Sequence, residues 1–258
     1  MTADPILRFE AVTKTFFVRG KQVEAVRSVS FALTPGRVVG IVGQSGSGKS
    51  TLANMMVRAE TPSEGSIRFE GQDVTALRGQ PLRHFRKSVQ MIFQDPFGSL
   101  NPRFSVERTV AEPLLIHGNR NADERRDIAA QALEDAELRP GTAFMDKLPH
   151  ELSGGQRQRV AIARALVLKP RVVVADEPVT MLDMSARAGV IRLLRRLVDE
   201  QELALAFITH DLSLIGSFCD EVAVMFKGEF IESGTPEAIL TAPQHDYTKR
   251  LIAAIPVP

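Results

Sequence analysis

A glycine-rich stretch at residues 43–51, GQSGSGKST, has the spacing of a phosphate-binding loop, G-x-x-x-x-G-K-[ST]. Its glycines let successive backbone N–H groups converge on phosphate oxygens, and its lysine can reach the terminal phosphates of a nucleotide. The hydroxyl that follows the lysine, on Ser50, can hold Mg²⁺. An apolar run before the loop and a helical pattern after it argue against a chance match. The residues expected to bind the nucleotide in this loop are Gly43, Ser45, Gly46, Gly48, Lys49, Ser50 and Thr51.

A second glycine pair occurs much later, in LPHELSGGQRQRVAIARAL at residues 148–166. Gly154 and Gly155 follow Ser153 and open a helical pattern, an arrangement that presents bare backbone N–H groups to an anion. One phosphate loop is enough to hold one nucleotide. The sequence therefore raises the question of what a second phosphate cradle in the same chain would bind.

Two adjacent carboxylates, Asp176 and Glu177, follow the apolar run VVVA. A phosphate loop needs a carboxylate at the end of a neighbouring strand to hold the Mg²⁺ shell, and Asp176 is placed for that. Because adjacent side chains at a strand end point in different directions, Glu177 can polarise water instead. Without the phosphate loop, these residues would indicate only a surface turn before Pro178. With it, the catalytic interpretation is favoured.

The composition is that of a globular protein without a membrane span. Apolar residues make up 44% and charged residues 24% of the 258 residues. No apolar run reaches the roughly 20 residues of a membrane helix, and the first ten residues predict no secretory peptide. The net charge of +1 gives no global signal for nucleic-acid binding. Cys219 is the single cysteine, which excludes an internal disulfide and a multi-cysteine metal site.

Alternating strand and helix patterns predict an α/β fold with a mostly parallel sheet. The expected strands lie at residues 6–18, 23–33, 37–42, 65–74, 88–94, 171–178 and 203–210, with a last hairpin over 220–234. The first two, joined by a turn at RGKQ, predict an N-terminal antiparallel β-subdomain. Helical patterns predict a helical subdomain, roughly residues 97–169, inserted into the core. One of its helices has Asn121 or Asp123 as a possible N-cap.

Six motifs occur in one order along the chain, and the order is far more specific than any single motif. They are GQSGSGKST at 43–51, Gln94 in FQDP, LSGGQ at 152–156, VVVADEP at 172–178, Asp183 in MLD and His210 in ITHD. Together they resemble the ATP-binding subunit of an ABC transporter, and the resemblance covers the whole chain as a single ATP-binding domain over 1–258. It implies a P-loop ATPase core that binds ATP and Mg²⁺ and hydrolyses ATP.

The resemblance also suggests an answer for the second cradle. In this family two cassettes face each other head to tail, so Ser153, Gly154, Gly155 and Gln156 would bind the γ-phosphate of ATP held by the partner's phosphate loop. ATP would then join the two chains, and closure would depend on the γ-phosphate. The partner is expected to be a second ATP-binding cassette, either identical or paralogous.

Further roles follow from the resemblance. Gln94 would contact Mg²⁺ or the attacking water, Asp176 would hold Mg²⁺, and Glu177 would act as general base. His210 would contact the γ-phosphate and position water. Without the family pattern, a lone glutamine after an apolar run carries no information, and a histidine at a strand end is more often structural.

The resemblance also assigns the adenine site and the contact between the two cassettes. Phe16 would stack on adenine, with Phe17 as the competing choice and an inward strand residue as the plain alternative. Asp183 would organise the dimer contact. One departure from the family pattern lies beside it, because Met181 stands where alanine is usual.

Two further stretches, QDPFGSLNPRFSV at 94–106 and HDYTKRLIAAIPVP at 245–258, resemble the oligopeptide, dipeptide and nickel importer branch of the family. In the second stretch Asp246 replaces the proline of the branch motif. The second stretch also reads as a short amphipathic tail that could pack on the core. No cysteine-bearing extension is present, so no iron–sulfur cluster is expected.

This branch implies partners at a membrane. The expected partners are two integral-membrane permease subunits and, indirectly, an external solute-binding protein, with the chain peripheral to the cytoplasmic face of the inner membrane. The surface near residues 94–106 is expected to receive a helix of a permease subunit, with Phe97, Leu100 and Phe104 lining part of the groove. No nucleic-acid partner is expected.

The predicted function is that of the ATP-hydrolysing motor subunit of an importer for peptides or a similar small solute. Two alternatives stay open at this point. One is a soluble ABC-type ATPase of a non-transport complex, such as a phosphonate-degrading assembly. The other is a module that binds ATP without hydrolysing it, against which Glu177 and His210 argue.

Overall fold

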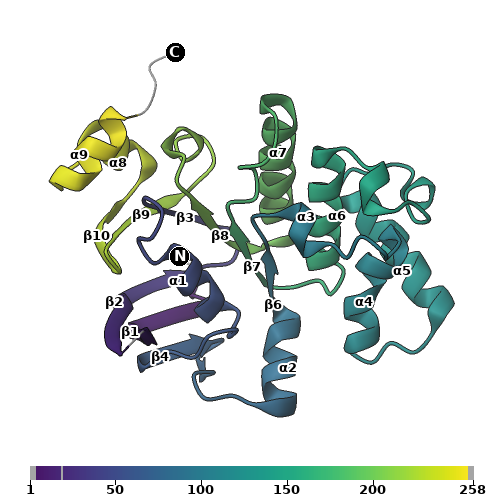
Figure 1. Ribbon diagram of the computed structural model, residues 1–258, viewed down its shortest axis with the longest axis horizontal. Helices are drawn as coiled ribbons and strands as arrows, with labels where there is room; N and C mark the ends of the chain where they lie inside the picture. The colour runs from purple at the N-terminus through teal and green to yellow at the C-terminus, as the bar shows by residue number, and fades with distance from the viewer. Residues whose placement is uncertain (1–3, 19, 255–258) are drawn as a thin grey trace.

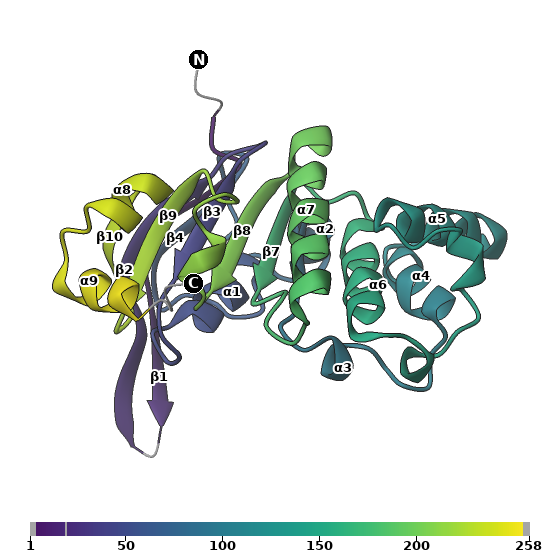
Figure 2. The same ribbon diagram turned by 90° about the horizontal axis from the view of Figure 1, so that it is seen from above.

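The structure of the protein is a computed structural model that describes residues 4–18 and 20–254, apart from the side chains of residues 96 and 97. Two β-sheets form one half of the molecule, and a group of helices extends from its other end (Figures 1 and 2).

The larger sheet has the strand order β10-β9-β3-β8-β7-β6. Every neighbouring pair in it is parallel except β10–β9. Its strands are β3 (Val38–Val42), β6 (Val89–Ile92), β7 (Val172–Asp176), β8 (Ala204–Thr209), β9 (Glu221–Phe226) and β10 (Glu229–Gly234). All residues of β3, β7 and β8 are buried, as expected for continuous apolar runs in a sheet covered on both faces. The predicted mostly parallel sheet is confirmed.

The smaller sheet is antiparallel, with the order β2-β1-β4-β5. It consists of β1 (Leu7–Val18), β2 (Lys21–Leu33), β4 (Glu64–Phe69) and β5 (Gln72–Asp73). The predicted strand over 65–74 is thus two strands. Glu70 and Gly71, between β4 and β5, both have positive φ, as in a tight two-residue hairpin turn.

Helices on the two faces of the parallel sheet complete two apolar cores. The helix α1 (Lys49–Met56) packs between the parallel and antiparallel sheets, whereas α7 (Met184–Gln201) covers the opposite face. Three more helices are α2 (Gly79–Ser88), α8 (Pro236–Thr241) and α9 (Asp246–Ala253). We did not predict α2 from the sequence.

A group of helices lies between β6 and β7, in the part of the chain where a helical insertion over roughly residues 97–169 was predicted. It contains α3 (Pro96–Ser99), α4 (Val106–Ile116), α5 (Ala122–Asp135) and α6 (Gly154–Leu166). Of the two candidate caps of α5, Asn121 is the N-cap, and its side chain accepts hydrogen bonds from the N–H groups of Asp123 and Glu124. Figures 1 and 2 show α4, α5 and α6 grouped at the end of the molecule opposite α8 and α9.

Among the residues that the structure describes, none of the helices combines the length and apolar composition needed to cross a bilayer.

The largest buried side chains predict where the fold is most sensitive. Phe207 on β8 is fully buried, and its ring packs edge-on against Phe218 at 4.8 Å. We expect Phe207→Ala to lower the free energy of unfolding by about 3–5 kcal/mol, because it removes a core aromatic ring and leaves a cavity. The matched control is Phe17→Ala, since Phe17 is 80% exposed, and it should change that free energy by less than about 0.5 kcal/mol. Urea denaturation of both variants measures the difference, and equal effects would contradict this assignment of the core.

Candidate active site

The phosphate loop joins the end of β3 to the start of α1, and its glycines are required by close packing. Gly48 has a φ of +110°, and a Cβ added there would lie 2.3 Å from the carbonyl oxygen of Ala25. A Cβ at Gly43 would lie 2.3 Å from the carbonyl oxygen of Met225. The loop is therefore held against β2 and β9, and larger residues at these two positions would force it out of place.

Lys49 is the buried cation of the site. Its ammonium donates hydrogen bonds to the carbonyl oxygens of Gly43 at 2.7 Å and Gln44 at 2.9 Å. Burial lowers the pKa of Lys49, and the carboxylates of Glu177 and Asp176 oppose this shift. The loop thus holds a positive charge beside its own backbone, where an anionic ligand would be stabilised.

Asp176 ends β7 and is the buried acid of the site. Burial raises its pKa, and the charge of Glu177 adds to this rise, whereas a hydrogen bond with Ser50 and the charge of Lys49 oppose it. The Asp176 carboxylate therefore lies beside the Ser50 hydroxyl at a buried position, where an uncompensated negative charge is unfavourable. Oxygen atoms of this kind are the ligands that Mg²⁺ prefers, so Ser50 and Asp176 fit the predicted metal.

Glu177 follows Asp176 and is held by three side chains. Its Oε2 accepts hydrogen bonds from Gln94 Nε2 at 2.9 Å and from Thr180 Oγ1 at 3.1 Å, and its Oε1 lies 3.0 Å from His210 Nδ1. The Glu177 side chain is 14% exposed and that of His210 is 50% exposed. The structure thus places two predicted residues, Gln94 and His210, at the carboxylate of a third, Glu177, which water can still reach.

The topology explains why these residues meet. Gln94, Glu177 and His210 each follow the carboxyl end of a parallel strand, β6, β7 and β8, and the phosphate loop follows β3 in the same sheet. The carboxyl ends of parallel strands lie at one edge, which is where open α/β sheets bind their ligands.

The second cradle lies elsewhere. Ser153 is the N-cap of α6 and forms a capping box with Gln156, in which Ser153 Oγ accepts the Gln156 N–H at 3.2 Å and Gln156 Oε1 accepts the Ser153 N–H at 3.0 Å. Gly154 and Gly155 form the first turn of α6, whose first N–H groups have no partner within the helix. In both views α6 lies away from α1, with β7 between them (Figures 1 and 2).

The two remaining predicted site residues lie on β1 and at the start of α7. Phe16 is half-buried, and the Lys14 ammonium lies 4.8 Å from its ring centre. It pairs with Val23 on β2. Two residues further along β2, Ala25 lies against Gly48, so Phe16 is near the phosphate loop. Phe17 is mostly exposed.

Asp183 caps α7 by accepting hydrogen bonds from Ala186 N and Ser185 Oγ, and these bonds lower its pKa. Met181 and Met184 on either side of it are exposed.

Thr180 was not predicted from the sequence. The sequence does place a hydroxyl residue in the turn directly after the acid pair. Which side chain this hydroxyl contacts depends on the shape of that turn. Glu177 has a φ of +47°, and the Thr180 N–H donates to the Glu177 carbonyl oxygen at 3.3 Å. This turn brings the threonine hydroxyl back to the Glu177 carboxylate.

Comparison with known proteins gives consistent matches. The family model described as ABC transporter matches residues 26–180. The chain is 43% identical to a putative peptide import ATP-binding protein of Brucella ovis over 258 residues, which cover 100% of this chain and 81% of the relative. It is also 43% identical to a dipeptide transport ATP-binding protein of Haemophilus influenzae, covering 99% of this chain and 78% of the relative.

A solved dimeric ATP-binding cassette in a post-hydrolysis state, bound to ADP and phosphate, is similar in structure. Its TM-score is 0.80 at 31% sequence identity, and the match covers 89% of this chain and 98% of that one.

We expect Thr180→Val to lower the turnover number of the predicted ATP hydrolysis by about fivefold to tenfold, because one hydrogen bond to the Glu177 carboxylate is lost. The Michaelis constant for ATP should change less than about twofold, since the described hydrogen bonds of Thr180 go to Glu177 and not to the phosphate loop. Thr180→Ser keeps the hydroxyl and is the matched control. Steady-state kinetics of the three proteins test this. A full loss in the serine variant, or none in the valine variant, would contradict it.

Proposed function

Because the chain belongs to the ABC transporter family, we propose that it is the ATP-hydrolysing motor subunit of an importer for peptides or a similar small solute. The observation that carries the proposal is the cluster of Gln94, Glu177 and His210 beside Lys49 and Asp176. The importers named among its relatives, for peptides and dipeptides, support this cargo class. They do not favour the alternative of a non-transport ATPase.

The binding step begins at the phosphate loop. ATP phosphates would meet the loop's N–H groups, and Lys49 would leave the carbonyl oxygens of Gly43 and Gln44 to contact them. Ser50, Asp176 and Gln94 would hold Mg²⁺, which supplies positive charge to the phosphate oxygens. This arrangement would remove the cost of keeping Lys49 and Asp176 charged while buried.

The hydrolytic step centres on Glu177. Its carboxylate would orient the attacking water and accept a proton from it. His210, half exposed and 3.0 Å from Oε1, would face the γ-phosphate and the same water. Gln94 and Thr180 hold Oε2, which leaves Oε1 as the oxygen beside His210.

The dimer supplies the last part of the site. The N-terminus of α6, with Ser153, Gly154 and Gly155, would bind the γ-phosphate of the ATP on a partner cassette. The position of α6 away from α1 supports this assignment, because an own-chain contact would require the two to be neighbours. Asp183, beside the exposed Met181 and Met184, would lie at the contact. The partner can be an identical or a paralogous cassette.

We expect Glu177→Gln to keep ATP binding, reduce turnover by at least about a hundredfold and accumulate a dimer in the presence of ATP. The amide keeps the shape of the side chain but cannot accept the proton from water. Size-exclusion chromatography with and without ATP, together with a phosphate-release assay, measures both effects. A variant that hydrolysed ATP at the wild-type rate would refute the assignment of the base.

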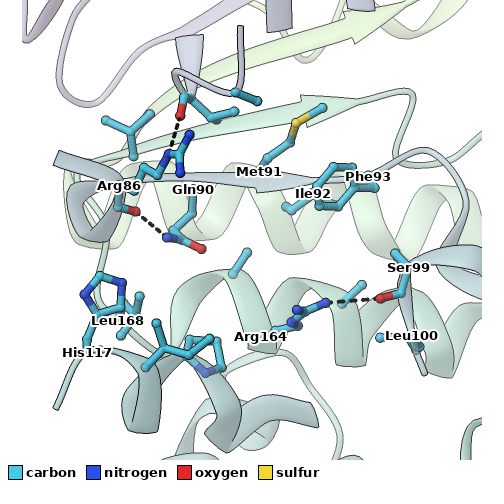
Figure 3. A pocket seen from close by; sticks show the side chains of 17 residues that line it. Arg86, Gln90, Met91, Ile92, Phe93, Ser99, Leu100, His117, Arg164 and Leu168 are labelled. Atoms are coloured by element: carbon cyan, nitrogen blue, oxygen red, sulfur yellow. Dashed lines mark hydrogen bonds between the residues drawn. The ribbon is translucent and has the colours of Figure 1, made fainter. Parts of the chain in front are cut away.

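A groove between the sheet and the helical insertion supports a membrane partner. The groove holds about 260 Å³ and lies between β6 and the helices α4 and α6 (Figure 3). Leu100, one of three residues expected to line such a groove, is among its lining residues but is only 2% exposed. Phe104 does not line it, because its ring packs against the Arg108 guanidinium at 3.5 Å. The side chain of Phe97, the third residue expected there, lies outside the described part of the structure.

The chemistry of the groove fits an amphipathic helix. Its apolar lining includes Met91, Phe93 and Ile116, and the last two are exposed. Arg86 and His117 lie toward one end of the groove (Figure 3). Burial and the charges of Arg83, Lys87 and His84 lower the pKa of His117 there. We therefore expect a cytoplasmic helix of a permease subunit that inserts apolar side chains and places a carboxylate near His117. This contact would keep the chain peripheral to the cytoplasmic face of the membrane.

Two neighbouring residues on α4 provide a matched test of the groove. Ile116 is 54% exposed and lines the groove, whereas Leu115 is 49% exposed and does not. We expect Ile116→Asp to reduce the membrane proteins that co-purify with the chain by roughly tenfold or more. Leu115→Asp should retain them, and both variants should still hydrolyse ATP. Mass spectrometry of mild-detergent pull-downs from native membranes measures this. If the wild-type chain captured only soluble proteins, the importer proposal would fail.

A further inference from the structure

The C-terminal stretch HDYT at residues 245–248 has no role in the mechanism above, yet it contacts the phosphate loop. Tyr247 is the only tyrosine of the chain, and it is 4% exposed. Its hydroxyl oxygen accepts the backbone N–H of Gln44 at 3.0 Å, across 203 residues of sequence. Gln44 is the second residue of the phosphate loop. The last helix therefore contacts the ATP site directly through one hydrogen bond.

The tyrosine is fixed from two sides. Its own N–H donates to Nδ1 of His245, the N-cap of α9, at 3.0 Å. Glu232 on β10 accepts the N–H groups of Gln244 at 2.7 Å and His245 at 3.1 Å, which ties the start of α9 to the sheet. The Tyr247 ring packs on the Phe226 ring with centres 4.2 Å apart. These contacts leave the hydroxyl little freedom to move.

Gln44 connects Tyr247 to the lysine of the loop through hydrogen bonds. Its N–H is bound by Tyr247, and its carbonyl oxygen and that of Gly43 both accept hydrogen bonds from Lys49. The orientation of this peptide unit thus affects both the backbone N–H groups that face phosphate and the resting place of the lysine. The far side of the loop is held similarly, since Gly228 N donates to the Ser47 carbonyl oxygen at 2.9 Å.

We propose that Tyr247 is a positioning residue for nucleotide binding, through which the C-terminal helix α9 keeps the phosphate loop in its ATP-binding shape. The proposal rests on the proposed function, because it concerns the ATP site of that motor. It also gives two residues of the HDYT stretch separate roles, since His245 caps the helix and Tyr247 contacts the loop. Asp246 between them is exposed.

Removing the hydroxyl alone tests this. Tyr247→Phe keeps the ring on Phe226 but leaves the part-buried Gln44 N–H without its acceptor, so the peptide can rotate away from its phosphate-binding orientation. We expect the Michaelis constant and the dissociation constant for ATP to rise about fivefold to tenfold, the size of one hydrogen bond. The turnover number should change less than about twofold, because Glu177 and its partners follow other strands.

Amide hydrogen exchange of the nucleotide-free protein gives a readout independent of activity. Exchange in the peptide that covers residues 43–48 should be faster in Tyr247→Phe than in the wild-type chain, while the peptides of β7 and β8 keep their rates. The matched control is Asp246→Pro, a change at the exposed first position of the same helix. Proline is tolerated there, so ATP affinity and exchange over 43–48 should stay as in the wild-type chain.

An unchanged ATP affinity in Tyr247→Phe, or an unchanged exchange rate over residues 43–48, would overturn the proposal. Equal effects of Asp246→Pro and Tyr247→Phe would do the same, because the hydroxyl would then not be the cause. Failure of the proposed function looks different, since the wild-type chain itself would not hydrolyse ATP. The exchange experiment would still decide whether the tyrosine holds the loop.

Discussion

The burial of opposite charges at one edge of the parallel sheet is the constraint on which the rest of the structure depends. Lys49 and Asp176 are both almost inaccessible to water. Burial lowers the pKa of Lys49 and raises that of Asp176, which favours the neutral form of each. Such groups are stabilised only by close partners at fixed distances. Fully buried strands hold both residues in place. The phosphate loop with Lys49 follows β3, and Asp176 ends β7. These strands and β8 cannot move without disturbing both cores.

Glu177 shows how this fixity is used. Its backbone is in the left-handed region, which costs of order 1 kcal/mol for a residue with a side chain. Such a conformation persists because its surroundings determine it. The carboxylate is bound by Thr180 of its own turn and by two residues from other segments, Gln94 and His210. The Glu177 carboxylate is therefore held in one orientation by its own chain, so this side chain would need little reorganisation for the proposed reaction.

The sequence predicted the features that depend on local patterns. The phosphate loop, the acid pair and the strands before them follow from runs of buried residues and glycine spacing. The helix α2 was missed because its sequence, GQPLRHFRKS, spans only ten residues, of which Leu82 and Phe85 pack on the core, and so short an apolar pattern is a weak helical signal. The contacts of Thr180 and Tyr247 were out of reach for another reason, since each depends on how distant or strained segments pack. Leu100 and Phe104 illustrate the remaining ambiguity, because an apolar residue in a loop can face the core, a groove or a neighbouring arginine.

The separation of the two glycine cradles has a kinetic consequence. With α6 away from α1 in the same chain, closing an ATP site in the proposed manner would require an encounter between two cassettes. In dilute solution the rate of closure would then grow with the square of the protein concentration. Membrane subunits that hold two cassettes side by side would replace the encounter by a fixed effective concentration. At low concentration, unassembled chains would therefore hydrolyse ATP more slowly than complete complexes.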